Sequence, residues 1–392
     1  MKIILNFYFY FVMEKEAMDL LRLLDAHRAL PDTYIIEFFT NSLWTTVLPP
    51  SWQAALDAAS QSDEATLATV ERLLTGKTVA SAGATAWPLS LLSLVATVHR
   101  AIRPRHPAST STSTTVVQQR PLPPWLTWGT IPKKTHELTR LAPVVAHAVA
   151  TVTTRTGQRP KVIDVGCGVG HLARVLASEL HVHVVGIEGD GDNVKTARYL
   201  NEQMDKRTRS RRAKAVAAEK EQQQLEERPM VDRVHVVHAR VDPHVEAASF
   251  RELVGLNGEE EGEKREAVLV GLHTCGDLAA TLLRRFVDMD GIRAVVSIGC
   301  CYMHIGEPDC FPLSEVLKRQ NVQLGWKMRE SACHSLDMYL DDIRRHGVGA
   351  FKIHAYRAAL EQIVRDHDPS CVREQAGSVR NGTDSEKIMC YF

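Results

Sequence analysis

The sequence predicts an α/β protein in which a doubly wound, mostly parallel sheet follows a small N-terminal helical domain. From Asp19 to about Arg103 the apolar residues recur only at helical spacing. After Lys134, short β-branched runs alternate with helical stretches, which is the pattern of βαβ units. The first of these runs leads directly into a glycine-rich turn and a new helical stretch. Together these observations favour a parallel sheet covered by helices on both faces.

The composition is that of an ordinary globular protein. The chain has 392 residues, of which 44% are hydrophobic and 24% are charged, so wholesale disorder is excluded. Its formal net charge is zero, so any affinity for nucleic acid must come from a local patch. The eight cysteines are scattered along a long chain, unlike those of a small secreted domain. We therefore expect a reducing compartment, the cytoplasm or the nucleus.

The first twelve residues are almost all apolar or aromatic, but the run stops at Glu14. A membrane-spanning helix needs about 20 apolar residues, so we expect no stable membrane association. Met13 to Glu16 offer no small-residue cleavage site of the kind that follows a signal peptide. We expect residues 1–12 to form a buried strand, or to extend upstream of a true start at Met13.

Changes in composition divide the chain into four segments. Residues 14–105 are expected to form the helical domain. Residues 106–124 contain a serine and threonine run followed by prolines, which predicts an exposed linker. Residues 125–368 are expected to form the α/β domain, and residues 369–392 a C-terminal tail.

Five short apolar runs are suited to burial on both faces of a parallel sheet. The predicted strands are Lys161–Val165, His183–Ile187, Val234–Ala239, Ala267–Leu272 and Arg293–Ile298. Between the second and third strands, residues 201–228 are rich in charged and amide side chains, which predicts a solvated helix. A basic cluster in this helix could touch RNA phosphates, although such faces are commonly just solvated. Its members are Lys206, Arg207, Arg209, Arg211, Arg212 and Lys214.

The glycine-rich turn predicts a site for a small nucleotide-like cofactor. Asp164 ends the first strand, and Gly166, Gly168 and Gly170 follow with the spacing Gly-x-Gly-x-Gly. Glycines allow a sharp turn and close approach to a ligand, while free amides at the following helix favour an anionic group. Dinucleotide sites usually have Gly-x-Gly-x-x-Gly. We therefore expect S-adenosylmethionine, with its methionine carboxylate at the helix start.

Glu188, at the end of the second strand, is the expected ligand of the two ribose hydroxyls. Asp242, after the third strand, is expected either to reach the adenine amino group or to cap a helix. The predicted cofactor-binding residues are Asp164, Gly166, Gly168, Gly170, Glu188 and Asp242.

Polar residues that follow the fourth and fifth strands should line the transfer site, since ligands bind outside the carboxyl ends of parallel strands. His273 could orient the acceptor or remove a proton, and Cys300 and Tyr302 follow the fifth strand. Asp277 could instead cap a helix. His273, Cys275, Cys300, Cys301 and His304 are of the types that bind zinc, but no Cys-x-x-Cys pair occurs, so we expect no metal.

Several segments of this sequence resemble the methyltransferase-like 25 family, including its branch named as ribosomal RNA adenine dimethylase domain-containing proteins. The resemblance rests on the glycine turn and on residues 132–137, 187–190, 271–278, 299–303 and 356–361. It implies a Rossmann-like class I methyltransferase fold that uses S-adenosylmethionine, with Gly166, Gly168, Gly170 and Glu188 in the family's cofactor positions.

The resemblance also implies an acceptor in RNA, either rRNA or tRNA. Enzymes that methylate the adenine amino group typically carry Asn/Asp-Pro-Pro-aromatic after the fourth strand, whereas this chain has Leu272-His273-Thr274-Cys275. The His-x-Cys-Gly and Cys-Cys segments are similar to those of enzymes that methylate tRNA ribose 2′-hydroxyls, and a hydroxyl acceptor would use His273 as a base. A translation-linked protein substrate and a non-catalytic binding module are the two alternatives.

Overall fold

The computed structural model describes residues 10–77, 86–102, 121–217, 229–256, 266–306, 310–334 and 336–370. These residues divide into two compact units. The first unit holds the described residues 10–14 and those between 121 and 329, and the second those between 15 and 102 together with those from 330 onward. None of the described helices combines the length and apolar character that a bilayer-spanning segment needs.

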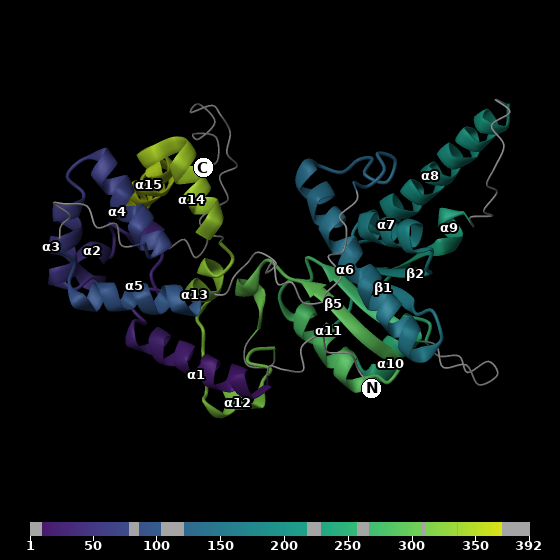
Figure 1. The fold of residues 1–392 in the computed structure, drawn as a ribbon, viewed down its shortest axis with the longest axis horizontal. Helices are drawn as coiled ribbons and strands as arrows, with labels where there is room; N and C mark the ends of the chain where they lie inside the picture. Colours follow the sequence, from purple (N-terminus) through teal and green to yellow (C-terminus); the bar gives the residue numbers. More distant parts are fainter. Residues whose placement is uncertain are drawn as a thin grey trace. The chain divides into compact units, whose positions relative to one another are not determined.

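The first unit is built on a sheet whose five described strands all run parallel (Figure 1). Their order across the sheet is β3-β2-β1-β4-β5. This arrangement confirms the predicted α/β class, and each predicted strand lies within one residue of an observed one. The strands are β1 Lys161–Val165, β2 Val184–Glu188, β3 Val234–His238, β4 Ala267–Leu272 and β5 Ile292–Ile298.

Helices cover both faces of this sheet because successive strand residues point to opposite sides. Val162 and Val268 belong to a core shared with α6, α7 and α8, whereas Ile163 and Leu269 belong to a core shared with α10 and α11. The covering helices are α6 Pro132–Thr156, α7 His171–Leu180, α8 Gly191–Ala217, α10 Ala247–Leu253 and α11 Asp277–Asp288. The shorter elements are α9 Met230–Arg233, η3 Tyr302–His304, α12 Glu315–Arg319 and α13 Trp326–Ser331.

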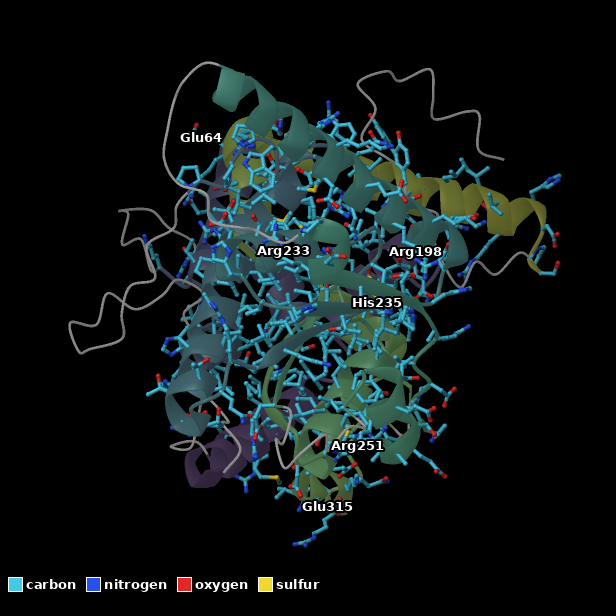
Figure 2. All side chains as sticks on the ribbon, turned by 90° about the vertical axis from the view of Figure 1, so that its right-hand side faces the viewer. Glu64, Arg198, Arg233, His235, Arg251 and Glu315 are labelled. Carbon is cyan, nitrogen blue, oxygen red and sulfur yellow. The ribbon has the colours of Figure 1, made fainter. Side chains whose placement is uncertain are left out.

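Two arginines tie these elements together through backbone carbonyls. Arg198 of α8 donates to the carbonyl oxygen of Val236 on β3 at 2.9 Å, and Arg233 of α9 donates to that of Ala177 in α7 at 3.0 Å. Both arginines are labelled in Figure 2. Each guanidinium satisfies a carbonyl that the local helix or strand leaves available, so α8 is attached to β3 and α9 to α7.

The second unit is helical, as predicted for its N-terminal part. Trp52, Ala55, Trp87 and Leu91 form its core, and the Trp52 indole donates to Ser90 Oγ at 2.8 Å. The N-terminal elements are α1 Tyr10–Ala26, η2 Ile35–Glu37, α2 Leu43–Val47, α3 Pro50–Ala59, α4 Asp63–Thr75 and α5 Leu89–Ala101. The C-terminal elements are α14 Leu336–His346, η4 Gly347–Phe351 and α15 Lys352–His367.

The predicted boundaries differ from the structure at both ends of the chain. Residues 330–368, which were predicted to lie in the α/β domain, pack with the N-terminal helices instead. The reason is that α14 and α15 have apolar faces, with Leu340 and Ala358 buried, and they bury these faces against α4 and η2. Residues 10–12 are helical rather than the predicted strand. The predicted linker up to residue 120 and the tail from 371 lie outside the described residues.

Candidate cofactor and acceptor site

The strand order places a topological switch point between β1 and β4, where open parallel sheets have their ligand-binding crevice. The chain moves outward from β1 to β2 and β3, and then crosses to the other side of β1 to form β4 and β5. The loops that follow β1 and β4 therefore leave the sheet in opposite directions, and ligands bind at such a switch point. These two loops are the glycine turn, residues 166–170, and residues 273–276.

The glycine turn requires its glycines because their backbones are left-handed. Gly166, Gly168 and Gly170 have φ angles of 69°, 56° and 78°. The amide of Gly166 donates to the carbonyl oxygen of Ile187 at 2.8 Å, which attaches the turn to the end of β2. A Cβ atom added to Gly168 would meet no atom within 4 Å. The turn is thus held on one side by β2 and open at Gly168.

Glu188 joins the second strand to this turn. Its Oε2 accepts a hydrogen bond from the amide of Gly168 at 2.7 Å, and its Oε1 accepts one from the amide of Asp190 at 2.9 Å. These bonds position the carboxylate beside the turn, and each oxygen keeps a further lone pair for an incoming hydroxyl. The sequence placed Glu188 after β2 on strand-end reasoning, and the structure brings it into direct contact with the turn.

Asp164 lies beneath the turn and is fully buried. Its side chain is 1% exposed, and its Oδ2 has no hydrogen-bond partner. Burial raises the pKa of this carboxyl to about 7, an effect that the charge of Lys134 partly opposes. A buried carboxylate oxygen without a partner is costly, so it requires an explanation. A cationic ligand group in the crevice would supply one.

The raised pKa of Asp164 predicts how the free energy of unfolding depends on pH. The folded chain keeps a proton that the unfolded chain releases between about pH 4 and 7, so the free energy of unfolding should fall as pH rises through this window and level off above it. Asp164→Asn has no such proton to lose. The variant should be more stable than the wild type at pH 8, by at most about 4 kcal/mol, and the gap should close towards pH 4.

Urea unfolding of both proteins across this pH range, without added cofactor, measures the gap. A gap that does not change with pH would show that Asp164 is ionised in both states, and would contradict the prediction.

The start of α7 adds further polar groups to the crevice. The Arg174 guanidinium is buried and lies 3.1 Å from His171 Nδ1 and 3.3 Å from Asn201 Oδ1. Burial lowers the pKa of His171 to about 4, and the charges of Arg174 and Lys134 lower it further. His171 is therefore neutral at pH 7, and positive charge near the turn comes from its neighbours. Such a helix start suits an anionic group.

Five of the six predicted cofactor residues lie on β1, the glycine turn and the end of β2, and their role towards a cofactor stays a prediction. Asp242 differs from them. Its exposed carboxylate accepts a hydrogen bond from the amide of His244 at 2.8 Å and forms a local turn. It does not cap a helix, since α10 begins at Ala247, and its role towards adenine stays a prediction.

The loop after β4 is strained and tightly packed. His273 has a φ of 67°, which is uncommon for a residue other than glycine. Thr274 is fully buried and shares a hydrogen bond of 2.8 Å with Ser297 Oγ of β5. A Cβ atom at Gly271 would lie 2.2 Å from the Thr274 methyl group, and one at Gly276 would lie 2.7 Å from the His304 carbonyl oxygen. Such strain persists where the surrounding structure fixes it, commonly at functional sites.

His273 forms a polar pair with α6. Its Nε2 lies 3.0 Å from Glu137 Oε2, and Lys134 Nζ lies 3.3 Å from the same oxygen. Burial alone would raise the pKa of Glu137, but the hydrogen bond and charge of His273 and the charge of Lys134 outweigh it, so this pKa is lowered. A charged Glu137 fixes the imidazole through Nε2. Among the described residues, Nδ1 makes no hydrogen bond.

Periodicity in the sequence did not reveal Glu137 and Lys134, because both lie in an amphipathic helix. The one signal was the segment 132–137, which contributed to the family resemblance. Asp277 also differs from expectation. It occupies the first helical position of α11 rather than capping it, and its Oδ1 accepts a hydrogen bond from the amide of Gly306 at 2.5 Å.

Three cysteines meet where the loops after β4 and β5 converge. Cys275 Sγ lies 3.3 Å from Cys300 Sγ, which lies 3.4 Å from Cys301 Sγ. Burial raises the pKa of Cys275, but hydrogen bonds from the backbones and thiols of Cys300 and Cys301 outweigh it, so the net shift is downward. Burial and the neighbouring thiols raise the pKa of Cys300 to about 12. Cys300 is exposed, as is Tyr302 at the start of η3.

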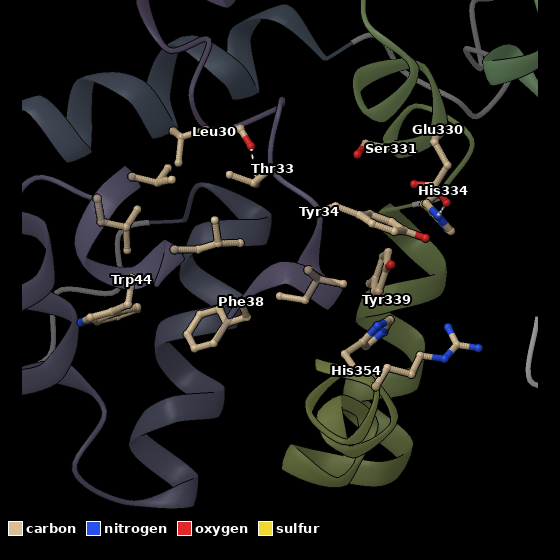
Figure 3. Close-up of a pocket in the computed structure, with 15 residues that line it drawn as sticks. Leu30, Thr33, Tyr34, Phe38, Trp44, Glu330, Ser331, His334, Tyr339 and His354 are labelled. Atoms are coloured by element: carbon tan, nitrogen blue, oxygen red, sulfur yellow. Dashed lines mark hydrogen bonds and ion pairs between the residues drawn. The ribbon is translucent and has the colours of Figure 1, made fainter. Parts of the chain in front are cut away.

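The second unit contains a separate pocket of about 530 Å³ (Figure 3). It is lined by mostly apolar and aromatic side chains from residues 30–48 and by polar and aromatic side chains from residues 330–357. Glu330 pairs with His334 at 3.0 Å, and the rings of Tyr339 and His354 lie 6.3 Å apart. Burial and the charge of Glu330 raise the pKa of Tyr34. None of the lining residues belongs to the glycine turn or to the loop after β4.

Comparison with known proteins finds a similarity within the first unit. Residues 133–308 match the family model described as "Methyltransferase domain", which covers a little under half of the chain and includes every predicted site residue. The chain is 35% identical over 118 residues to "Probable methyltransferase-like protein 25" of Mus musculus, and 34% identical over 113 residues to the Homo sapiens protein of the same name.

These alignments cover 26% of this chain, and 19% of the mouse and 18% of the human protein. Among solved structures, the chain matches the plantazolicin methyltransferase BpumL in complex with SAH, with 10% identity and a TM-score of 0.22 over 62% of this chain and 88% of that one. The family match and the sequence relatives confirm the resemblance that the sequence suggested. Residues 133–308 of the first unit thus match a methyltransferase domain, for which S-adenosylmethionine is the cofactor, and they contain the predicted parallel sheet.

Proposed function

We propose that this chain transfers a methyl group from S-adenosylmethionine to a hydroxyl group of RNA. The observation that carries the proposal is the position of Glu188 and His273 on the two sides of the switch point. Glu188 is bonded to the glycine turn on the β2 side, and His273 is held by Glu137 on the β4 side. A cofactor position and a candidate base thus border the same crevice.

The residues around the glycine turn have the chemistry to hold the cofactor. The Glu188 carboxylate would accept hydrogen bonds from the ribose hydroxyls, and the amides at the start of α7 would face the carboxylate. Asp164 would place its unpaired oxygen against the cationic amino group. When bound, S-adenosylmethionine supplies an electrophilic methyl group on a sulfonium. The protein's contribution to transfer is then largely positioning.

The pair of His273 and Glu137 favours an oxygen acceptor. A hydroxyl must lose its proton during methylation, and a neutral imidazole held at one nitrogen can accept that proton at the other. Glu137 accepts from Nε2, which leaves Nδ1 to act as the base. An adenine amino acceptor would instead call for the Asn/Asp-Pro-Pro-aromatic segment, and the chain has Leu272 to Cys275 there. A ribose 2′-hydroxyl fits these residues best.

The basic part of α8 supports RNA as the acceptor molecule. Lys206 and Arg207 begin a run of basic residues on this helix, and the Arg207 guanidinium lies 3.8 Å from the ring centroid of Trp128. Both side chains are exposed. Arginine and aromatic surfaces of this kind recur where proteins bind single-stranded nucleic acid. A protein acceptor, or a domain that binds the cofactor without turnover, remains the alternative.

Radiolabel transfer tests this proposal. The full chain is incubated with S-adenosylmethionine that carries a labelled methyl group, together with separate tRNA, rRNA and protein fractions. We expect label in an RNA fraction that nuclease removes and protease does not. Digestion of the labelled RNA to nucleosides should yield a 2′-O-methyl nucleoside. Label that only protease removes would refute the RNA acceptor, and the absence of label in every fraction would favour a binding module.

A further inference from the structure

We propose that Cys275, Cys300 and Cys301 bind one zinc ion through their three sulfur atoms, with the fourth coordination position open to solvent. This site is separate from the cofactor residues and does not depend on which molecule accepts the methyl group. It also differs from the sequence prediction, which expected no metal.

The spacing of the three sulfurs fits a single metal ion. All three lie within 4.8 Å of one another, with neighbouring separations of 3.3 and 3.4 Å. Zinc binds thiolates at about 2.3 Å in a tetrahedral arrangement, which sets its ligand sulfurs about 3.8 Å apart. A small outward movement of the sulfurs would therefore accommodate the ion.

The backbone around the cysteines holds them in this arrangement. Cys275 lies between two residues with positive φ angles, His273 and Gly276. The backbone of Gly276, with a φ of 63° and a ψ of −140°, suits only glycine. The amide of Cys300 donates to Cys275 Sγ at 3.3 Å, as amides commonly do to metal-bound sulfur. The bonds from Thr274 to Ser297 and from Gly306 to Asp277 join the two loops on either side of the cluster. The ligands are thus positioned before any metal binds.

The kind of ligand selects the metal. Sulfur ligands favour zinc over magnesium and calcium, which prefer oxygen. Three protein ligands with a free position distinguish an open zinc site from a closed structural one. The exposure of Cys300 places this free position towards solvent. His273 and His304, the two histidines that the sequence grouped with these cysteines, lie outside the group of three that the structure brings together.

The competing explanation is a disulfide between Cys275 and Cys300. Their sulfurs would have to approach from 3.3 Å to about 2.05 Å, the length of the bond. A disulfide would consume two of the three thiols and needs an oxidant, whereas zinc would use all three in a reducing compartment. The two explanations make opposite predictions about metal content and about thiol oxidation.

The test measures metal in the full chain, purified without an affinity tag in a reducing buffer from cells grown with zinc. Plasma mass spectrometry should find one zinc per chain. Cys275→Ser, Cys300→Ser and Cys301→Ser should each lower this value towards zero. Cys333→Ser, a cysteine of the second unit, should retain it and serves as the matched control. Neither cofactor nor acceptor is needed, so the result is independent of the proposed function.

A second measurement applies if the variants do not fold. The wild-type chain, stripped of zinc by a chelator and titrated with cobalt, should develop the thiolate-to-cobalt charge-transfer band and the visible bands of a tetrahedral site at one equivalent. Absence of these bands, or zinc that persists in all three variants, would overturn the proposal. A Cys275–Cys300 disulfide in non-reducing peptide maps of metal-free protein would overturn it in favour of oxidation.

Discussion

Replacing His273 with asparagine is expected to slow methyl transfer by about 10²- to 10⁴-fold, the usual contribution of a positioned general base. Asparagine tolerates the left-handed backbone, with φ of 67°, that this position adopts, so the loop should keep its conformation. It has no ring nitrogen that can take the hydroxyl proton. The affinity for S-adenosylmethionine should not change, because the cofactor residues lie on β1 and β2.

Two measurements separate a base from a residue that only shapes the loop. In His273→Asn the transfer rate should fall while the Michaelis constant for the RNA stays near the wild-type value, whereas a distorted loop would change both. Glu137→Gln keeps a hydrogen-bond acceptor for the imidazole but removes the charge. It should therefore lower the rate less than His273→Asn does. A His273→Asn enzyme with the wild-type rate would show that the proton leaves by another route.

The strands were predictable because burial on both faces of the sheet requires short runs of apolar residues, which are visible in the sequence. Val162 and Ile163 face opposite cores, and neither position tolerates a polar residue, so apolar residues stand side by side in this run. The turn after β1 was predictable for a different reason. Its three glycines have left-handed backbones, so their spacing records the shape of the turn directly.

The contacts that complete the site left weaker signals. Glu137 and His273 are 136 positions apart, and nothing in the periodicity of α6 distinguishes Glu137 from a solvated glutamate. The cysteine cluster depends on the pairing of β4 with β5, which brings Cys275 beside Cys300 without a Cys-x-x-Cys motif. Likewise, α15 buries Ala358, although its partners lie more than 300 residues earlier in the chain, around Ile35. Amphipathic spacing predicts that a helix has a partner but does not identify it.

Replacing Glu188 with alanine should have an equally large effect, on binding rather than on chemistry. A hydrogen bond to a charged group contributes about 1.5–3 kcal/mol, and the carboxylate would accept one from each ribose hydroxyl. Loss of both should weaken S-adenosylmethionine binding by about 10²- to 10⁴-fold. The variant also releases the Gly168 and Asp190 amides, which solvent can satisfy because Glu188 is only partly buried. The fold should therefore survive.

Isothermal calorimetry with S-adenosylmethionine measures this loss, with circular dichroism to confirm that the variant is folded. Asp192→Asn is the matched control, because it removes a nearby exposed carboxylate that pairs with Lys195 at 2.8 Å and has no bond to the glycine turn. It should bind like the wild type. An unchanged affinity in Glu188→Ala would show that the ribose does not bind at this position. The cofactor assignment at the switch point would then fail with it, because Glu188 is the carboxylate that the Gly168 amide holds beside the turn.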